Sequence, residues 1–227
     1  MKNAENKLNE IEGAGCPVDI RLRRPKWNGD EKMAGTAILP EDQKIFSMQE
    51  LKSKGFSQYK VSKLVDEGRL IKLNKCYFEN ADFSGEESEF YYMEAYAPNG
   101  VICLMSAAVY YGLSTFIPDA VDVAIPRKSK VSKMPDWPQI NVHHYTDDRH
   151  GLGIIKIKEG GNEFRIYDIE KTVVDIVFYR EKVGIEETKE ILINYLQRKD
   201  RNLNRLLKYA RRMKCEKAMR GYLEVLV

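Results

Sequence analysis

The chain has 227 residues, of which 43% are apolar and 31% charged, and this is enough material for one large or two small folded cores. Its 37 basic and 34 acidic residues leave a net charge of only +3, so composition alone does not identify a nucleic-acid-binding protein. No apolar run approaches the roughly 20 residues of a membrane span, and the first residues lack the apolar stretch of a signal peptide. A disordered chain is excluded, and membrane and secreted proteins are disfavoured.

The four cysteines, Cys16, Cys76, Cys103 and Cys215, lie far apart without a CxxC pair. This spacing argues against a zinc site and against a disulfide scaffold, and it suits a reducing, cytoplasmic location. Because Cys76 and Cys103 lie in apolar surroundings, we expect both to be small buried residues. No metal and no cofactor is expected.

Charge is distributed unevenly along the chain. Residues 1–38 and 39–83 each carry a net charge of +1, residues 84–196 carry −6, and residues 197–227 carry +7. Residues 1–38 contain several glycines and prolines without a sustained hydrophobic period, so they are predicted to be a flexible leader in which only Asp19 to Arg23 suits a strand.

Clear helix signals begin after Leu39. Ser47 and Glu50 have the spacing of a capping box, which predicts a short helix over Met48 to Lys54. Ser57 suits the cap of a second helix over Gln58 to Glu67. Two short strands around a tight turn are predicted next, over Leu70–Leu73 and Cys76–Phe78. Helix, turn, helix and hairpin in this order predict a winged helix-turn-helix over residues 39–83.

The remaining residues, 84–227, predict a mixed α+β domain that ends in a helical segment. In chain order we expect a helix capped by Ser84 and ending at Pro98, a strand over Val101–Leu104, a helix capped by Ser106, strands over Val121–Ile125 and Ile140–His144, a hairpin over Gly153–Lys158 and Glu163–Tyr167, a helix capped by Asp168, and three further helices. The fold class expected for the whole chain is therefore α+β.

The second of the two N-terminal helices is the candidate DNA-reading element. If Val61, Leu64 and Val65 face the core, Tyr59, Ser62 and Lys63 lie on the opposite side of the helix. Such polar side chains suit phosphates and base edges, and lysines at the hairpin suit the neighbouring backbone. The candidate DNA-binding residues are Ser57, Gln58, Tyr59, Lys60, Ser62, Lys63, Lys72, Asn74 and Lys75. The alternative is an ordinary amphipathic helix with a solvated side.

A basic cluster near the carboxyl end is the strongest charge feature. It comprises Arg198, Lys199, Arg201, Arg205, Lys208, Arg211, Arg212, Lys214, Lys217 and Arg220. If Leu203, Leu206, Leu207 and Ala210 are buried, these cations project from the exposed side of a helix pair. The functional interpretation is a second polyanion contact, to DNA or RNA, through Arg201, Arg205, Lys208, Arg211 and Arg212. The alternative is a run of charge that only solvates the helices.

Two segments resemble enzyme sites in their composition. Gly112-Leu113-Ser114, followed by Asp119 and Asp122, has the residue types of a nucleotidyltransferase site. Residues three apart on a strand point to opposite faces, however, so the two carboxylates are not expected to share an ion. The second segment has the residue types of a metal site, namely His143, His144, Asp147, Asp148 and His150. A surface turn is the preferred interpretation there, and no catalytic residue is predicted.

Several tyrosines, Tyr91, Tyr92, Tyr96, Tyr110 and Tyr111, are expected to pack in the core rather than stack on bases.

The order of these motifs resembles the AbiEi family of antitoxins from type IV toxin–antitoxin systems. The resemblance runs from about Leu39 to about Tyr222, and four segments carry it: Gly68–Leu73 leading to Cys76–Phe78, Leu104–Leu113, Val121–Pro126 and Tyr167–Asp175. Lys75 stands where the family usually has glycine.

The resemblance implies a transcriptional autorepressor whose winged helix binds inverted repeats in double-stranded DNA upstream of its own operon. It also implies that the second domain counters a nucleotidyltransferase toxin without a stable complex. The DNA-reading helix would be Gln58 to Glu67 and the wing Leu70 to Phe78. Two further functions stay open: a nucleotidyltransferase-like enzyme, and a protein-interaction module that uses the winged helix.

Overall fold

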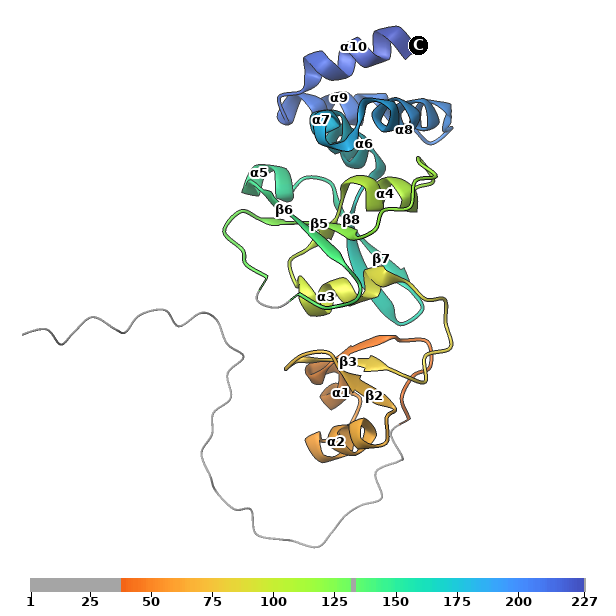
Figure 1. Ribbon diagram of the computed structural model, residues 1–227, viewed down its shortest axis with the longest axis vertical. Helices are drawn as coiled ribbons and strands as arrows, with labels where there is room; N and C mark the ends of the chain where they lie inside the picture. Colours follow the sequence, from red (N-terminus) through yellow and green to blue (C-terminus); the bar gives the residue numbers. More distant parts are fainter. Residues whose placement is uncertain (1–37, 132–133, 227) are drawn as a thin grey trace, which may run out of the picture. The chain divides into compact units, whose positions relative to one another are not determined.

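The computed structural model describes residues 38–131 and 134–226, which fold as a mixed α+β structure with two sheets (Figure 1). The predicted leader, including Asp19 to Arg23, lies outside the described residues apart from Ile38. All the described residues belong to one compact unit, Ala37–Val227. None of their helices is long and apolar enough to cross a membrane.

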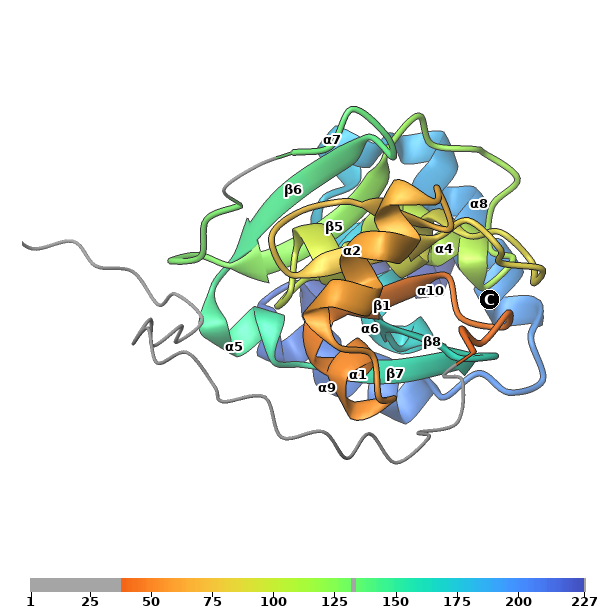
Figure 2. The same cartoon turned by 90° about the horizontal axis from the view of Figure 1, so that it is seen from below.

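The first elements form a small antiparallel sheet with two helices on it. They are β1 (Ile45–Ser47), α1 (Met48–Ser53), α2 (Gln58–Asp66), β2 (Leu70–Lys72) and β3 (Tyr77–Asn80). The strand order is β1-β3-β2, so β3 lies in the centre. The side view and the view from below place α1 and α2 on the side of this sheet that faces away from the five-stranded sheet (Figures 1 and 2).

Local signals at the helix ends explain why α1 and α2 form where they do. The amide of Glu50 donates to the Ser47 hydroxyl at 3.1 Å, and the Ser47 amide donates to the Glu50 carboxylate at 2.7 Å, which completes the predicted capping box. Gly55 follows α1 with a φ of +88°, a conformation that favours glycine. Ser57 then caps α2 by accepting from the Lys60 amide at 3.3 Å.

The apolar side of α2 packs as predicted. Val61 is 2% exposed, and Leu64 and Val65 are half-buried against the same core. The other buried members of this core are Leu39, Phe46, Leu51, Phe56, Leu70 and Phe78. At roughly 1.5–3 kcal/mol for each large apolar side chain, this core holds the two helices on the sheet.

The second sheet has five strands in the order β6-β5-β4-β8-β7. They are β4 (Val101–Ile102), β5 (Val121–Pro126), β6 (Ile140–Tyr145), β7 (Ile154–Glu159) and β8 (Asn162–Tyr167). The pairs β5–β6 and β4–β8 run parallel, whereas β4–β5 and β7–β8 run antiparallel. The predicted hairpin around Gly160-Gly161 is the β7–β8 pair.

Helices cover both faces of the five-stranded sheet. Short helices η1 (Glu89–Tyr92) and α3 (Met93–Tyr96) pack on one face. The other face carries α4 (Leu104–Tyr110) and α6 (Ile169–Phe178), over which lie α8 (Ile185–Gln197), α9 (Leu203–Arg212) and α10 (Glu216–Leu226). Two further short helices are α5 (Asp147–His150), between β6 and β7, and α7 (Arg180–Val183), between α6 and α8.

Several local predictions are wrong. Ser84 does not cap a helix, because Glu87 pairs with Lys44 at 2.7 Å, and the helical region begins only at Glu89, capped by Ser88. Ser106 does not cap α4 either. This helix begins at Leu104, and the Ser106 hydroxyl accepts from the Asp122 amide of β5 at 2.8 Å.

Two burial predictions also fail. Cys76 is exposed at the β2–β3 turn, whereas Cys103 is fully buried and burial raises its pKa. Leu203 is 40% exposed, although it lies on the same side of α9 as Ala210, and it is the first residue of the helix.

The β7–β8 turn connects the five-stranded sheet to the segment that leads into β1. The Gly161 amide donates to the Asp42 carbonyl at 3.0 Å, and the Lys44 amide donates to the Asn162 side chain at 2.7 Å. Gly160 has a φ of +58°, and a Cβ on Gly161 would lie 2.7 Å from the Cβ of Gln43. This approach therefore requires the two glycines.

Candidate nucleic-acid interface

The outward side of α2 carries the side chains that the sequence predicts. Tyr59 is 80% exposed, the Lys63 side chain is 66% exposed, and Gln58, Lys60 and Ser62 are also exposed. Lys63 makes only a 3.7 Å pair with Glu67 on the same helix, and a pair this exposed stabilises little. The side chains are thus free to meet a ligand while Val61 anchors the opposite side of the helix.

The hairpin residues are placed unequally. Lys72 and Lys75 are exposed, as a backbone contact requires. Asn74 is turned inward instead: its amide donates to the Ala95 carbonyl of α3 at 2.8 Å, and its side-chain oxygen accepts from the amides of Cys76 and Tyr77. The prediction that Asn74 contacts DNA is therefore wrong, because its polar atoms already hold the β2–β3 turn and fix it to α3.

The hairpin packs on the second sheet through apolar contacts too. Leu73 and Tyr77 lie against the core formed by η1, α3 and the sheet. This interaction explains the inward position of Asn74, and sequence reasoning missed it because a turn residue carries no signal for a partner that lies 21 positions away in the chain.

Two cations at the end of α1 were not predicted as candidate contacts. Lys52 lies in the last turn of α1 and Lys54 directly after it, and both are exposed. In a helix-turn-helix the first helix crosses the DNA backbone, so these lysines suit phosphates. The basic residues in the last turn of the first helix are the signal that points to them.

The residues of the nucleotidyltransferase-like segment do not form a phosphate cradle. The Ser114 hydroxyl accepts from the Phe116 amide at 3.2 Å and lies 3.4 Å from the Glu190 carboxylate, which would repel a phosphate. The Asp122 carboxylate contacts His143 Nε2 at 2.8 Å, and Asp119 is exposed outside β5.

The histidine segment is dispersed. His143 faces Asp122, whereas His150 lies 3.1 Å from the Asn99 carbonyl, and burial lowers its pKa. Within residues 38–131 and 134–226, no three His, Cys, Asp or Glu side chains lie close enough together to hold a metal ion.

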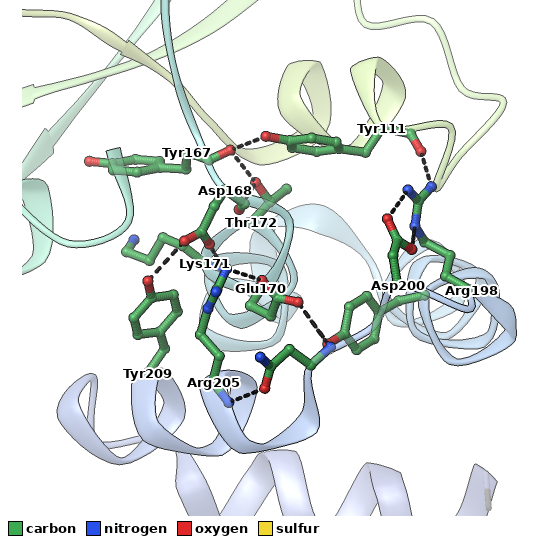
Figure 3. Close-up of polar contacts among 12 residues, drawn as sticks. Tyr111, Tyr167, Asp168, Glu170, Lys171, Thr172, Arg198, Asp200, Arg205 and Tyr209 are labelled. Carbon is green, nitrogen blue, oxygen red and sulfur yellow. Dashed lines mark hydrogen bonds and ion pairs between the residues drawn. The ribbon is translucent and has the colours of Figure 1, made fainter. Parts of the chain in front are cut away.

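The Tyr167–Asp175 segment attaches α9 to α6 (Figure 3). Asp168 caps α6 by accepting from the Lys171 amide at 2.8 Å, and its other oxygen accepts from the Tyr209 hydroxyl of α9, also at 2.8 Å. Burial and the Asp168 carboxylate raise the pKa of Tyr209 to about 12, so the phenol keeps its proton and donates this bond across the physiological range.

Glu170 makes the second connection to α9. Its carboxylate is 2% exposed and accepts from the Asn202 amide at 3.0 Å, while Arg205 lies 3.4 Å from its other oxygen. The Tyr195 hydroxyl also lies 3.3 Å from the Glu170 carboxylate, as well as accepting from the Asn202 amide. The start of α9 is therefore fixed by charge-assisted hydrogen bonds to α6.

Lys171 and Asp175 form a fully buried ion pair on α6. The ammonium lies 2.5 Å from the carboxylate and 4.2 Å from the centre of the Tyr167 ring. All the segment's charged side chains thus have partners inside the fold, so this motif acts through the packing of α6 and α9.

Comparison with known proteins does not identify a family or a function for these residues. The chain matches no protein-family model and no curated protein. The case for a function therefore depends on the placement of the side chains, above all those on the outward side of α2.

Proposed function

We propose that residues 39–83 are a winged helix-turn-helix that binds double-stranded DNA, with α2 in the major groove. The order β1-α1-α2-β2-β3 supports this proposal, as does the turn at Gly55 between the helices. The observation that carries it is the outward side of α2, where exposed Tyr59 and Lys63 lie opposite buried Val61.

The expected affinity is moderate. Few exposed cations around α2 are free of an acidic partner. Arg69 pairs with Asp82 at 2.7 Å, and Lys63 lies near Glu67. Lys52, Lys54, Lys60, Lys72 and Lys75 remain for phosphates among the described residues of this part. Five phosphate contacts give a slope of log affinity against log salt of about −4.5.

We further propose that the protein is a cytoplasmic autorepressor and antitoxin of the AbiEi type. The motifs that carry the resemblance occur in the order and spacing described above, and they coincide with structural elements: the hairpin, α4, β5 and the start of α6. In this function α2 binds inverted repeats upstream of its own operon, and the second part of the chain counters a nucleotidyltransferase toxin without forming a stable complex.

Binding to the upstream DNA tests the role of α2. In fluorescence anisotropy with a duplex from the region upstream of the gene, Tyr59→Ala with Lys63→Ala should weaken binding by about 1–3 kcal/mol for each base-reading side chain that is removed. The matched control is Phe116→Ala with Lys189→Ala, which removes an aromatic ring and a lysine from outside residues 39–83. Equal affinity of the two variants would exclude α2 as the reading helix. Recovery of a protein partner at high salt without DNA would favour the interaction module.

Antitoxin activity needs a separate experiment. If the neighbouring gene encodes a nucleotidyltransferase, co-expression with this chain should restore growth. Because the DNA-reading surface lies on α2, the Tyr59→Ala and Lys63→Ala variant should still restore growth while it no longer represses a reporter. Loss of both repression and growth restoration in a variant that folds normally would contradict the assignment of DNA reading to α2 and of antitoxin activity to the second part of the chain.

A further inference from the structure

A basic surface extends along α9 and to both of its ends. Four of the ten cations near the carboxyl end have carboxylate partners: Arg198 with Asp200, Arg205 with Glu170, and both Arg211 and Arg220 with Glu216. The other six are exposed, and no carboxylate of the described residues lies within 4.0 Å of them. We call these six residues the α9 basic surface: Lys199, Arg201, Lys208, Arg212, Lys214 and Lys217.

The fold fixes the direction in which the α9 basic surface points. Leu206 and Ala210 are fully buried on α6, so at 100° per residue Lys208 and Arg212 lie on the opposite side of α9. Asp168 and Glu170 hold α9 in this orientation through Tyr209 and Asn202 (Figure 3). Lys208 and Arg212 are therefore presented by a helix that is fixed to the fold, and the other four cations lie next to its two ends or on α10.

The chemistry of the α9 basic surface favours a double-stranded over a single-stranded nucleic acid. Single strands are bound by stacking bases on exposed aromatic rings. The two tyrosines of this region offer none, because Tyr209 is half-buried with its hydroxyl on Asp168, and Tyr222 packs against the core. What remains is an array of cations that suits a phosphate backbone.

Helix α9 lies near one end of the described residues, next to α10, and α2 lies at the other end (Figure 1). Between α9 and α2 lie α6, the five-stranded sheet, α3 with η1, and the N-terminal sheet. At about 10 Å per layer, this stacking separates the two surfaces by roughly 50 Å. A straight duplex of 12 base pairs is only about 40 Å long and cannot span them.

We propose that the α9 basic surface binds the phosphate backbone of a second segment of duplex DNA, without reading its sequence. The choice of DNA as the polyanion rests on the proposed function of α2. The protein thereby holds two DNA segments at once: one bound specifically at α2, the other bound through phosphates at α9. Six phosphate contacts give a slope of log affinity against log salt of about −5.

Salt titrations with a fluorescent 12-base-pair DNA duplex of unrelated sequence test the proposal. Replacing Lys208, Arg212 and Lys217 by Gln removes three cations from the surface and should reduce the slope from about −5 to about −3. The matched control replaces Lys156, Lys158 and Lys189 by Gln, which removes the same charge from lysines that have carboxylate partners. An equal slope for the two variants would overturn the proposal.

A gain of binding gives an independent test that unfolding cannot mimic. Arg211 and Arg220 lower the pKa of Glu216 to about 2, so this carboxylate stays charged and pairs with both arginines. Glu216→Gln frees the two arginines and should steepen the slope by about 2. An unchanged or shallower slope would contradict a phosphate contact at α9.

Two further measurements separate this proposal from its alternatives. Operator DNA on beads should retain a second, labelled duplex through the wild-type protein but not through the Lys208, Arg212 and Lys217 variant. If α2 does not bind DNA, the wild-type protein should fail to retain the second duplex, while its salt slope with unrelated DNA stays unchanged. A 12-base-pair RNA duplex that binds at least tenfold tighter than DNA would assign the surface to RNA and overturn the choice of DNA.

Discussion

The buried ion pair between Lys171 and Asp175 allows the sharpest stability prediction. Both side chains are fully buried, and Asp175 Oδ1 and the Tyr145 hydroxyl find no hydrogen-bond partner among the described residues. Burial raises the pKa of Asp175 although Lys171 opposes this shift, so the pair is costly to desolvate. Removing one partner of such a pair strongly destabilises the folded protein. Replacing both partners by apolar residues of the same volume changes the stability little.

Lys171→Met leaves a buried carboxylate without a cation and should lower the free energy of unfolding by about 3–5 kcal/mol. Asp175→Leu should cost a similar amount because the ammonium is then unpaired. The double variant should lie within about 1 kcal/mol of the wild type or above it. Urea unfolding followed by circular dichroism measures all four stabilities. A double variant as unstable as the sum of the two single changes would refute the reasoning.

Three other changes probe the fold. Val61→Ala removes two methyl groups from the core under α2 and should cost about 2 kcal/mol in urea unfolding; a decrease below about 0.5 kcal/mol would mean that α2 is not anchored there. Gly161→Ala places a Cβ 2.7 Å from Gln43 and should cost about 1–3 kcal/mol, whereas an unchanged melting temperature would exclude this close approach. Burial lowers the pKa of His150 below 6.5, so its stabilising contribution is complete above pH 6.5 and is lost as the pH falls through the lowered value; His150→Gln should remove this part of the pH dependence, and an unchanged profile would contradict it.

Features that depend on neighbouring residues were predicted well from the sequence. The capping box at Ser47, the cap at Asp168 and the hairpin at Gly160-Gly161 all occur as expected. Each depends on hydrogen bonds or turn geometry within a few residues, so the local sequence contains the whole signal. The inward side of α2 follows for the same reason, because helical periodicity alone places Val61, Leu64 and Val65 together.

Features that depend on distant partners were not predicted. Ser84 has the spacing of a capping box, but Glu87 instead meets Lys44, which lies 43 residues earlier. The side chain of Asn74 binds α3, and the Ser106 hydroxyl binds the backbone of β5. Nothing in the sequence around these residues identifies their partners, since only the tertiary fold brings them together. The ion pairs near the carboxyl end also depend on the tertiary fold, so the sequence did not show which six cations are left without a carboxylate partner.

Mapping where α2 lies on DNA tests most directly whether this helix reads DNA. A cysteine introduced by Ser62→Cys, in a background with Cys16→Ser and Cys76→Ser, can carry an iron-based reagent that cleaves nearby DNA. If α2 lies in the major groove, we expect cleavage at a few adjacent nucleotides in each half of the upstream inverted repeat, and none from the same reagent on Lys158→Cys. Absence of cleavage from position 62, or cleavage spread evenly along any duplex, would contradict the proposal that α2 reads DNA.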